Sequence, residues 1–283
     1  MKNNLDTVYV RAFGEYQERR NFSPKTVRCR HAVLAAFGAH LQPRSYLAAT
    51  PEDVEGWLRT CQLGAQGRYT YLSHVHAFYR FLGRRGLTTV DPTATIDRPK
   101  LPKRLPRPIT PAELDAALAA AGTQMRAWLY LGSYAGLRRA EIARLEREHV
   151  LDHLQPPMLL VMDGKGTKDR TVPLHPAVLA ALTACGLRHG GPLFRAAGGG
   201  PVSPDHVGEQ VARFLRRIGI DRTCHSTRHH FGTAVYGLCR DLLMTRDLMG
   251  HANASSTEGY VAFDAGPAAG VVGRIGMPPR VAH

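Results

Sequence analysis

"DPTATIDRPKLPKRLPRPITPAEL", residues 91–114, contains six prolines and several basic residues, and its apolar residues follow no helix or strand period. Proline fixes the backbone angle φ and removes a hydrogen-bond donor, so neither a helix nor a central strand continues through such a segment. We therefore expect an extended linker at residues 99–108. This linker divides the 283 residues into two expected domains, residues 1–98 and residues 109–283.

The segment before the linker has a helical pattern throughout. Ser23 precedes Pro24 and Thr50 precedes Pro51, and both pairs are typical of an N-cap followed by the first helical residue. Asp53 stands where a capping-box carboxylate reaches back to the cap. "GRYTYLSHVHAFYRFLGRRG", residues 67–86, places apolar residues at helical spacing and ends in glycine. These features predict a compact bundle of about four helices.

The segment after the linker has a mixed pattern. Helices are expected over residues 110–122, 125–136 and 137–150. "PPMLLVMDGKGTKDRTVPLH", residues 156–175, has an apolar run, a glycine-rich turn and a short β-rich run, which predicts a hairpin. The remainder is helical again, apart from a Gly- and Pro-rich loop at residues 195–206. The expected fold class is mainly α with a small β-sheet, and the second domain is of the α+β type.

The charge of the chain indicates a polyanionic partner. Lys and Arg total 37 against 23 Asp and Glu, which gives a formal net charge of +14. This excess favours nucleic acid, because each phosphate that a protein neutralises releases a condensed counterion. An anionic membrane surface, or solubility alone, would also account for it.

The expected compartment is the cytoplasm. No apolar run approaches the length of a membrane span, and the N-terminal stretch "MKNNLDTVYVRAFGEYQERR" lacks the apolar core of a secretory signal. The five cysteines are widely spaced and form no C-x-x-C pair, which indicates reduced, structural thiols.

Two basic motifs of the second domain are candidates for phosphate binding. In "GLRRAEIARL", residues 136–145, Arg138 and Glu141 are three residues apart, so the carboxylate can orient the guanidinium toward phosphate oxygens. In "GKGTKDR", residues 164–170, Lys165 lies between two glycines at the expected hairpin tip. Taken alone, the first motif is better explained as a surface ion pair and the second as an ordinary exposed turn lysine.

"CHSTRHHFGT", residues 224–233, places His225 and Arg228 on one face of a helix. That arrangement can hold a phosphate oxygen beside an imidazole that transfers a proton. A zinc site would use His225 and His229, but the metalloprotease pattern needs glutamate after the first histidine, and Ser226 is there instead. We therefore predict no metal at this motif.

"DLMGHANASSTEGY", residues 247–260, places His251 after a glycine and Tyr260 nine residues later. The polar residues between them can present a tyrosine hydroxyl at a surface. A packed tyrosine ring with a hydrogen-bonded hydroxyl is the structural alternative.

In their order and spacing, these motifs resemble the tyrosine recombinase family, also called the phage integrase family. The resemblance covers essentially the whole chain. It implies that residues 1–98 form a helical core-binding, SAM-like domain and that residues 109–283 form the catalytic domain with a C-terminal tail. The pattern starts near residue 5, so we expect a compact member without an arm-binding domain.

The resemblance also implies roles for individual residues. Tyr260 would attack a DNA phosphodiester and form a 3′-phosphotyrosyl bond. Arg138 and Arg228 would hold the non-bridging oxygens and stabilise the charge of the transition state. Glu141 would orient this cluster.

Two further residues would transfer protons, and a third would bind the phosphate. Lys165 would protonate the departing 5′-oxygen, His225 would accept the tyrosine proton, and His251 would hydrogen-bond the phosphate. No metal and no cofactor is implied. The family's usual leucine before Gly-His is Met249 here, a volume-conserving change. The sequence leaves the roles of His229 and His230 open.

The expected partner is double-stranded DNA carrying core recombination sites, bound by a homo-tetramer on two duplexes. The tail would dock on a neighbouring protomer, unless it is a disordered terminus, and an accessory directionality factor would fit the family. The sequence suggests six basic residues as DNA contacts: Arg28, Arg68, Lys103, Arg104, Lys168 and Arg170.

Several alternatives remain beside recombination. A type IB topoisomerase uses similar chemistry, a regulator could keep the fold without the activity, and a metal-dependent nuclease would need carboxylate clusters that these motifs lack. Within recombination, we favour integration of a mobile element such as a phage over Xer-like dimer resolution or transposon recombination.

Overall fold

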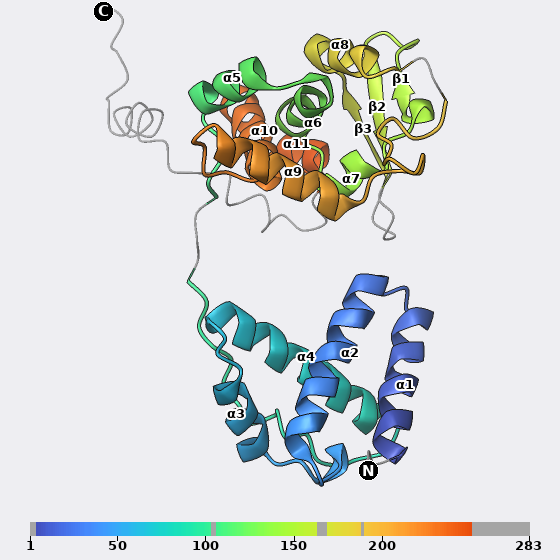
Figure 1. Cartoon of the computed structure of the whole chain (residues 1–283), viewed down its shortest axis with the longest axis vertical. Helices are drawn as coiled ribbons and strands as arrows, with labels where there is room; N and C mark the ends of the chain where they lie inside the picture. The colour runs from blue at the N-terminus through green and yellow to red at the C-terminus, as the bar shows by residue number, and fades with distance from the viewer. Residues whose placement is uncertain (1–3, 103–105, 163–168, 188–189, 251–283) are drawn as a thin grey trace, which may run out of the picture. The chain divides into compact units, whose positions relative to one another are not determined.

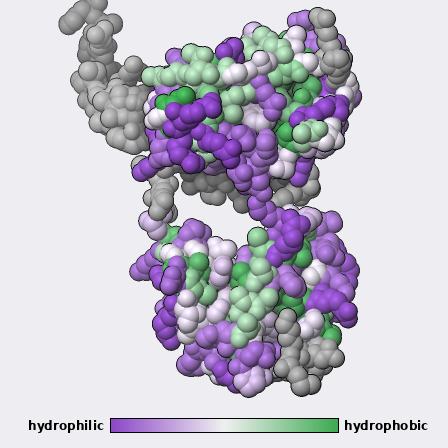
Figure 2. All heavy atoms as spheres, in the orientation of Figure 1, coloured by the Kyte–Doolittle hydropathy of each residue, from purple (hydrophilic) through white to green (hydrophobic). Residues whose placement is uncertain are grey.

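The computed structural model describes residues 4–102, 106–162, 169–187 and 190–250. The chain divides into two compact units, Met1–Arg104 and Leu105–His283 (Figure 1). Each unit has its own apolar core. On the face drawn in Figure 2, hydrophilic residues predominate, with smaller apolar areas between them.

The first unit is helical in all its described regular elements. These are α1 (Asn4–Arg19), α2 (Pro24–Leu41), the 3-10 helix η1 (Tyr46–Ala48), α3 (Pro51–Thr60) and α4 (Ala65–Arg84). The predicted bundle of about four helices is confirmed. Its core is rich in aromatic rings, such as Phe37 and Trp57, whose ring centroids lie 5.0 Å apart.

The helix starts in this unit follow the sequence signals. Ser23 Oγ accepts a hydrogen bond of 3.2 Å from the backbone N–H of Thr26, so α2 begins at the predicted cap. At the start of α3, Asp53 accepts from the Thr50 N–H at 2.9 Å, and Thr50 Oγ1 accepts from the Asp53 N–H at 3.4 Å. Both predicted caps are therefore present.

The second unit combines helices with one small sheet. Its helices are α5 (Pro111–Ala120), α6 (Thr123–Tyr134), α7 (Arg139–Ala143), η2 (Arg147–His149), α8 (Pro176–Ala184), α9 (Pro204–Arg217), α10 (Cys224–Cys239) and α11 (Leu242–Met249). Its strands are β1 (Val150–Leu151), β2 (Met158–Val161) and β3 (Arg170–Pro173). In Figure 1 the strands lie together at one side of the unit, beside α8 and α7.

The sheet is antiparallel in the order β1-β2-β3. Strands β2 and β3 pair Leu159 with Val172, and both side chains are buried. They form the predicted hairpin, whose tip, residues 163–168, lies outside the described residues.

Helices α6 and α10 pack closely in the centre of this unit. A Cβ atom at Gly132 of α6 would lie 2.0 Å from Oγ1 of Thr227 on α10, so only glycine allows this approach. The contact fixes the start of α10 against the core and buries the next side chain, Arg228.

The prediction of one helix over residues 137–150 is wrong for the second half of that range. Helix α7 ends at Ala143, and the chain pairs with a later segment instead of continuing the helix. Leu145 O accepts from the Leu193 N–H at 2.9 Å, and the Arg147 N–H donates to Gly191 O at 2.9 Å. These backbone hydrogen bonds replace those of a continued helix, and the chain then enters β1.

Within the described part of the chain, no helix has the length and apolar character needed to cross a membrane.

Candidate active site

Arg138 and Glu141 meet at the start of α7. Arg138 is the N-cap, and its backbone N–H donates to Glu141 Oε2 at 2.7 Å. Its side chain donates from Nη1 to Glu141 Oε1 at 2.7 Å. The carboxylate therefore satisfies an N-terminal helix donor and orients a guanidinium that is 37% exposed.

Arg228 approaches the same carboxylate from α10. Its side chain is only 1% exposed, and its Nη1 lies 3.7 Å from Glu141 Oε2. The guanidinium also donates to the backbone carbonyls of Gly136 and Met249. An arginine held by several fixed acceptors keeps one orientation, which is the condition for binding a phosphate with defined geometry.

Arg170 completes the cluster, and its position corrects the prediction that it contacts DNA. Its guanidinium donates to both carboxylate oxygens of Glu141, at 3.0 and 2.9 Å. Its Nε donates to Leu248 O at 3.0 Å, and the side chain is 8% exposed. All three guanidinium nitrogens thus donate to protein acceptors, and Arg170, unlike Arg138 and Arg228, does not line the basic groove of this unit.

Glu141 is the centre of this cluster of three arginines, and its side chain is 7% exposed. Burial alone would raise the pKa of its carboxyl. The hydrogen bonds and charge of Arg170, the Arg138 N–H and the charge of Arg228 outweigh burial and lower the pKa to about 2. Glu141 is therefore ionised at neutral pH, which offsets part of the arginine charge.

His225 and His229 lie one turn apart on α10, with ring centroids 4.2 Å apart. Partial burial, together with the charges of Arg228, Arg138 and Arg139, lowers the pKa of His225 below its ordinary 6.5. Burial, with the charges of His225 and Arg228, lowers the pKa of His229 to about 4. Both rings are neutral at pH 7, so His225 can accept a proton.

His230 has a different environment. Its Nδ1 lies 2.9 Å from the backbone carbonyl of Ile109, which ties α10 to the segment before α5. Of the two histidines whose roles the sequence left open, His229 thus contacts the candidate base, and His230 contacts the backbone.

A basic groove of about 770 Å³ opens over these residues, lined by α7, α9 and the start of α10. Arg138, His225 and Arg228 all line it. Three further arginines line its wall and are not among the residues predicted from the sequence: Arg139, Arg213 and Arg216.

The missed α9 arginines have a signal in the sequence. Helix α9 buries Val207, Val211 and Phe214 on one face, which leaves Arg213 and Arg216 on the opposite, exposed face. The helical period of residues 204–217 therefore predicts a basic face there. The net charge of +14 indicates that such a face binds a polyanion.

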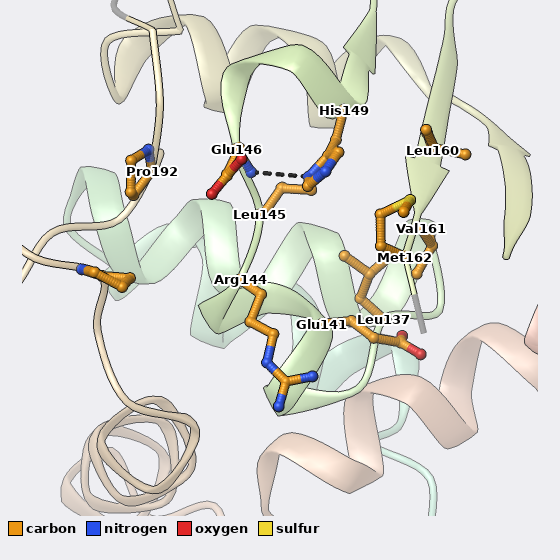
Figure 3. Close-up of a pocket in the computed structure, with 11 residues that line it drawn as sticks. Leu137, Glu141, Arg144, Leu145, Glu146, His149, Leu160, Val161, Met162 and Pro192 are labelled. Carbon is orange, nitrogen blue, oxygen red and sulfur yellow. Dashed lines mark hydrogen bonds between the residues drawn. The ribbon is translucent and has the colours of Figure 1, made fainter. Parts of the chain in front are cut away.

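A second pocket, of about 280 Å³, lies next to Glu141 (Figure 3). Its lining is mostly apolar and includes Leu137, Leu145 and Val161. A pocket of this kind does not suit a phosphate, so we assign phosphate binding to the basic groove.

The remaining predicted residues divide into two groups. Arg28 and Arg68 are exposed, on α2 and α4 of the first unit. Six lie outside the described residues: Lys103, Arg104, Lys165, Lys168, His251 and Tyr260. Among the described residues, no three His, Cys, Asp or Glu side chains are grouped to hold a metal ion.

Comparison with known proteins decides the family. The model described as the phage integrase family matches residues 108–266, which include every element of the basic groove. The chain belongs to the phage integrase family of tyrosine recombinases. The model of the family's N-terminal SAM-like domain matches residues 10–86. Like the family, the chain is a tyrosine-type DNA strand transferase.

Similar proteins include a tyrosine recombinase XerC and solved structures of lambda integrase. A tyrosine recombinase XerC of Methylobacterium sp. (strain 4-46) is 34% identical over 281 residues, which are 87% of this chain and 85% of that protein. A lambda integrase dimer bound to a COC′ core site has a TM-score of 0.73 at 16% identity, over 90% of this chain and 94% of that one. A lambda integrase tetramer bound to a Holliday junction has a TM-score of 0.71 at 16% identity, over 88% of this chain and 78% of that one. These structures confirm the fold class, a helical SAM-like domain followed by an α+β catalytic domain.

Proposed function

We propose that this chain is a site-specific recombinase that cuts and rejoins double-stranded DNA at core-type sites through Tyr260. The observation that carries the proposal is the convergence of Arg138, Arg228 and His225 on one basic groove, with Glu141 behind them. This arrangement supplies two fixed guanidinium groups and a neutral imidazole, which are the groups that transfer of a phosphoryl group to a phenol needs.

In the proposed cleavage step, the Tyr260 oxygen attacks the scissile phosphorus and the bond from phosphorus to the 5′-oxygen breaks. His225 takes the phenol proton, and Lys165 gives a proton to the 5′-oxygen. Arg138 and Arg228 hold the non-bridging oxygens while negative charge grows on them, and His251 adds a hydrogen bond. Because the phosphotyrosyl bond replaces one phosphodiester bond, attack by a 5′-hydroxyl reverses the step without a further energy source.

The arginines of the groove wall would add to the affinity for DNA. Arg139, Arg213 and Arg216 lie beside the proposed phosphate ligands and suit the neighbouring backbone phosphates of a duplex. We assign Arg28 and Arg68 of the first unit to further phosphates, because both are exposed.

The low pKa of His225 predicts the pH dependence of cleavage. The neutral ring is the active form, so the rate falls as the pH drops through the His225 pKa. We expect the acid limb of the second-order rate of adduct formation on nicked DNA to have its midpoint below 6.5. The limb is expected to disappear in His225→Gln, and a midpoint at or above 6.5 would contradict the role of His225.

For the biological role, we propose Xer-like dimer resolution in place of the integration that the sequence analysis favoured. The similarity to proteins named tyrosine recombinase XerC, at 34% and 30% identity over most of their length, supports this choice. By the same analogy with the lambda integrase tetramer on a Holliday junction, we propose that four copies act together on two duplexes.

The two roles differ in the sites they need. A dimer of a circular DNA molecule contains every sequence twice, so dimer resolution recombines two copies of the same site. Integration recombines two different sites. Sites would first be recovered by trapping covalent adducts on nicked fragments of the source genome. A supercoiled plasmid with two copies of one recovered site in direct repeat is expected to yield two circles. Recombination only between unlike sites would support integration instead, and no adduct at all would favour a catalytically silent regulator.

A further inference from the structure

We propose that Arg170 is a positioning residue for strand cleavage: it holds the C-terminus of α11 against Glu141, and so fixes the position of Gly250, the residue before His251. The inference rests on the proposed roles of Arg138, Arg228 and His251 in binding the scissile phosphate. It adds a residue that binds no DNA and acts through the others.

The first observation is a set of three consecutive backbone carbonyls at the end of α11, each bound by a different arginine. Leu248 O accepts from Arg170 Nε at 3.0 Å, and Gly250 O accepts from Arg138 Nη2 at 2.9 Å. Between them, Met249 O accepts from Arg228. The last carbonyls of a helix have no partner in the helix and carry partial negative charge, so cations stabilise them.

The second observation is the reach of Arg170. All three of its guanidinium nitrogens donate to described acceptors, Nε to α11 and the two Nη atoms to Glu141. The side chain thereby joins β3, α7 and α11 in one buried contact. Arg170 begins β3, so the first residue of this strand is anchored to the same carboxylate as Arg138 and Arg228.

The third observation explains the glycine before His251. Gly250 has φ +61°, and a Cβ atom there would lie 2.8 Å from Nη1 and 2.9 Å from Cδ of Arg170. Glycine is therefore required both for the left-handed conformation and for the space that Arg170 occupies. The Arg170 side chain and the Gly250 backbone fit one another, and the chain that follows them carries His251 and Tyr260.

The test compares Arg170→Met and Arg170→Lys in the full chain, using nicked duplexes that carry a recovered site. We expect Arg170→Met to slow single-turnover adduct formation at saturating DNA by about 100-fold, the scale of a misplaced reacting group, while the Kd for DNA changes less than about threefold. Lysine restores part of the rate because it keeps the charge. Arg147→Met is the matched control. Arg147 is also partly buried and its guanidinium lies 3.0 Å from the Asp152 carboxylate, and neither residue lines the groove.

A double-mutant cycle tests the fit between Arg170 and Gly250. In the wild-type background, Gly250→Ala meets both the clash and the left-handed strain, whereas in Arg170→Ala only the strain remains. We therefore expect Gly250→Ala to slow adduct formation at least about tenfold less in the Arg170→Ala background. Gly219→Ala is the control, because Gly219 has φ +80° with no atom within 4 Å of a built Cβ.

The outcomes separate this inference from the proposed function. If wild-type protein forms the adduct, but Arg170→Met and Arg170→Lys both cleave at the wild-type rate, Arg170 is not a positioning residue. Additive effects of Gly250→Ala and Arg170→Ala would also overturn the inference. If wild-type protein forms no adduct on any fragment, the proposed function itself fails.

Discussion

Replacing Arg228 with lysine is expected to slow covalent adduct formation by about 100- to 1,000-fold, the cost of removing one fixed donor from a transition-state oxyanion. The guanidinium of Arg228 is 1% exposed and held by the carbonyls of Gly136 and Met249 as well as by Glu141. An ammonium group keeps the charge but cannot satisfy these acceptors and a phosphate oxygen together.

The measurement is the single-turnover rate of adduct formation at saturating nicked DNA, with the Kd measured separately. Arg216→Lys is the comparison, since Arg216 lines the same groove but is exposed. We expect Arg216→Lys to keep its cleavage rate. A wild-type rate in folded Arg228→Lys would exclude Arg228 from the phosphate site.

Replacing Glu141 with glutamine is expected to destabilise the second unit by about 3–5 kcal/mol, because it removes a buried carboxylate that pairs with three guanidinium groups. Within the described residues, Arg138, Arg170 and Arg228 all pair with this one group. Glutamine keeps the shape of the side chain but removes the negative charge that these three guanidinium groups share.

The unfolding of each unit can be followed separately, because Trp57 lies in the first unit and Trp128 in the second. In a Trp57→Phe background, Trp128 fluorescence reports the urea midpoint of the second unit. Glu209→Gln, a change at an exposed carboxylate of the same unit, is expected to leave the midpoint unchanged. Equal midpoints for Glu141→Gln and Glu209→Gln would show that the cluster does not stabilise the fold.

The same carboxylate predicts sensitivity to acid. Its pKa falls from an ordinary 4.5 to about 2 on folding, so its contribution is fully present above pH 4.5 and is lost as the pH falls through 2. The shift corresponds to about 3 kcal/mol at 1.36 kcal/mol per pH unit. Glu141→Gln is expected to remove this part of the pH dependence.

The sequence predicts local features of the fold best where the signal is short in range. Ser23 and Thr50 mark helix starts because an N-cap depends only on residues within one turn. The helix over residues 137–150 was overextended because its end is set by backbone pairing of Leu145 with Leu193, which no local pattern contains.

The site shows the same limit. The spacing of Arg138 and Glu141, and of His225 and Arg228, predicts pairs that share a face. The structure brings Arg138, His225 and Arg228 to one groove and pairs both arginines with Glu141. Arg170 was misassigned because its sequence neighbours are polar turn residues, whereas its partners, Glu141 and Leu248, are 29 and 78 residues away.

The central claim is that Tyr260 becomes covalently linked to DNA in this basic groove. The most direct measurement is mass spectrometry of the peptide linked to DNA after wild-type protein is trapped on nicked duplexes under denaturing conditions. The account predicts a nucleotide on Tyr260, formed equally with and without chelator and absent from Tyr260→Phe although that variant still binds the DNA. A nucleotide on another residue, or an adduct that persists in Tyr260→Phe, would contradict it.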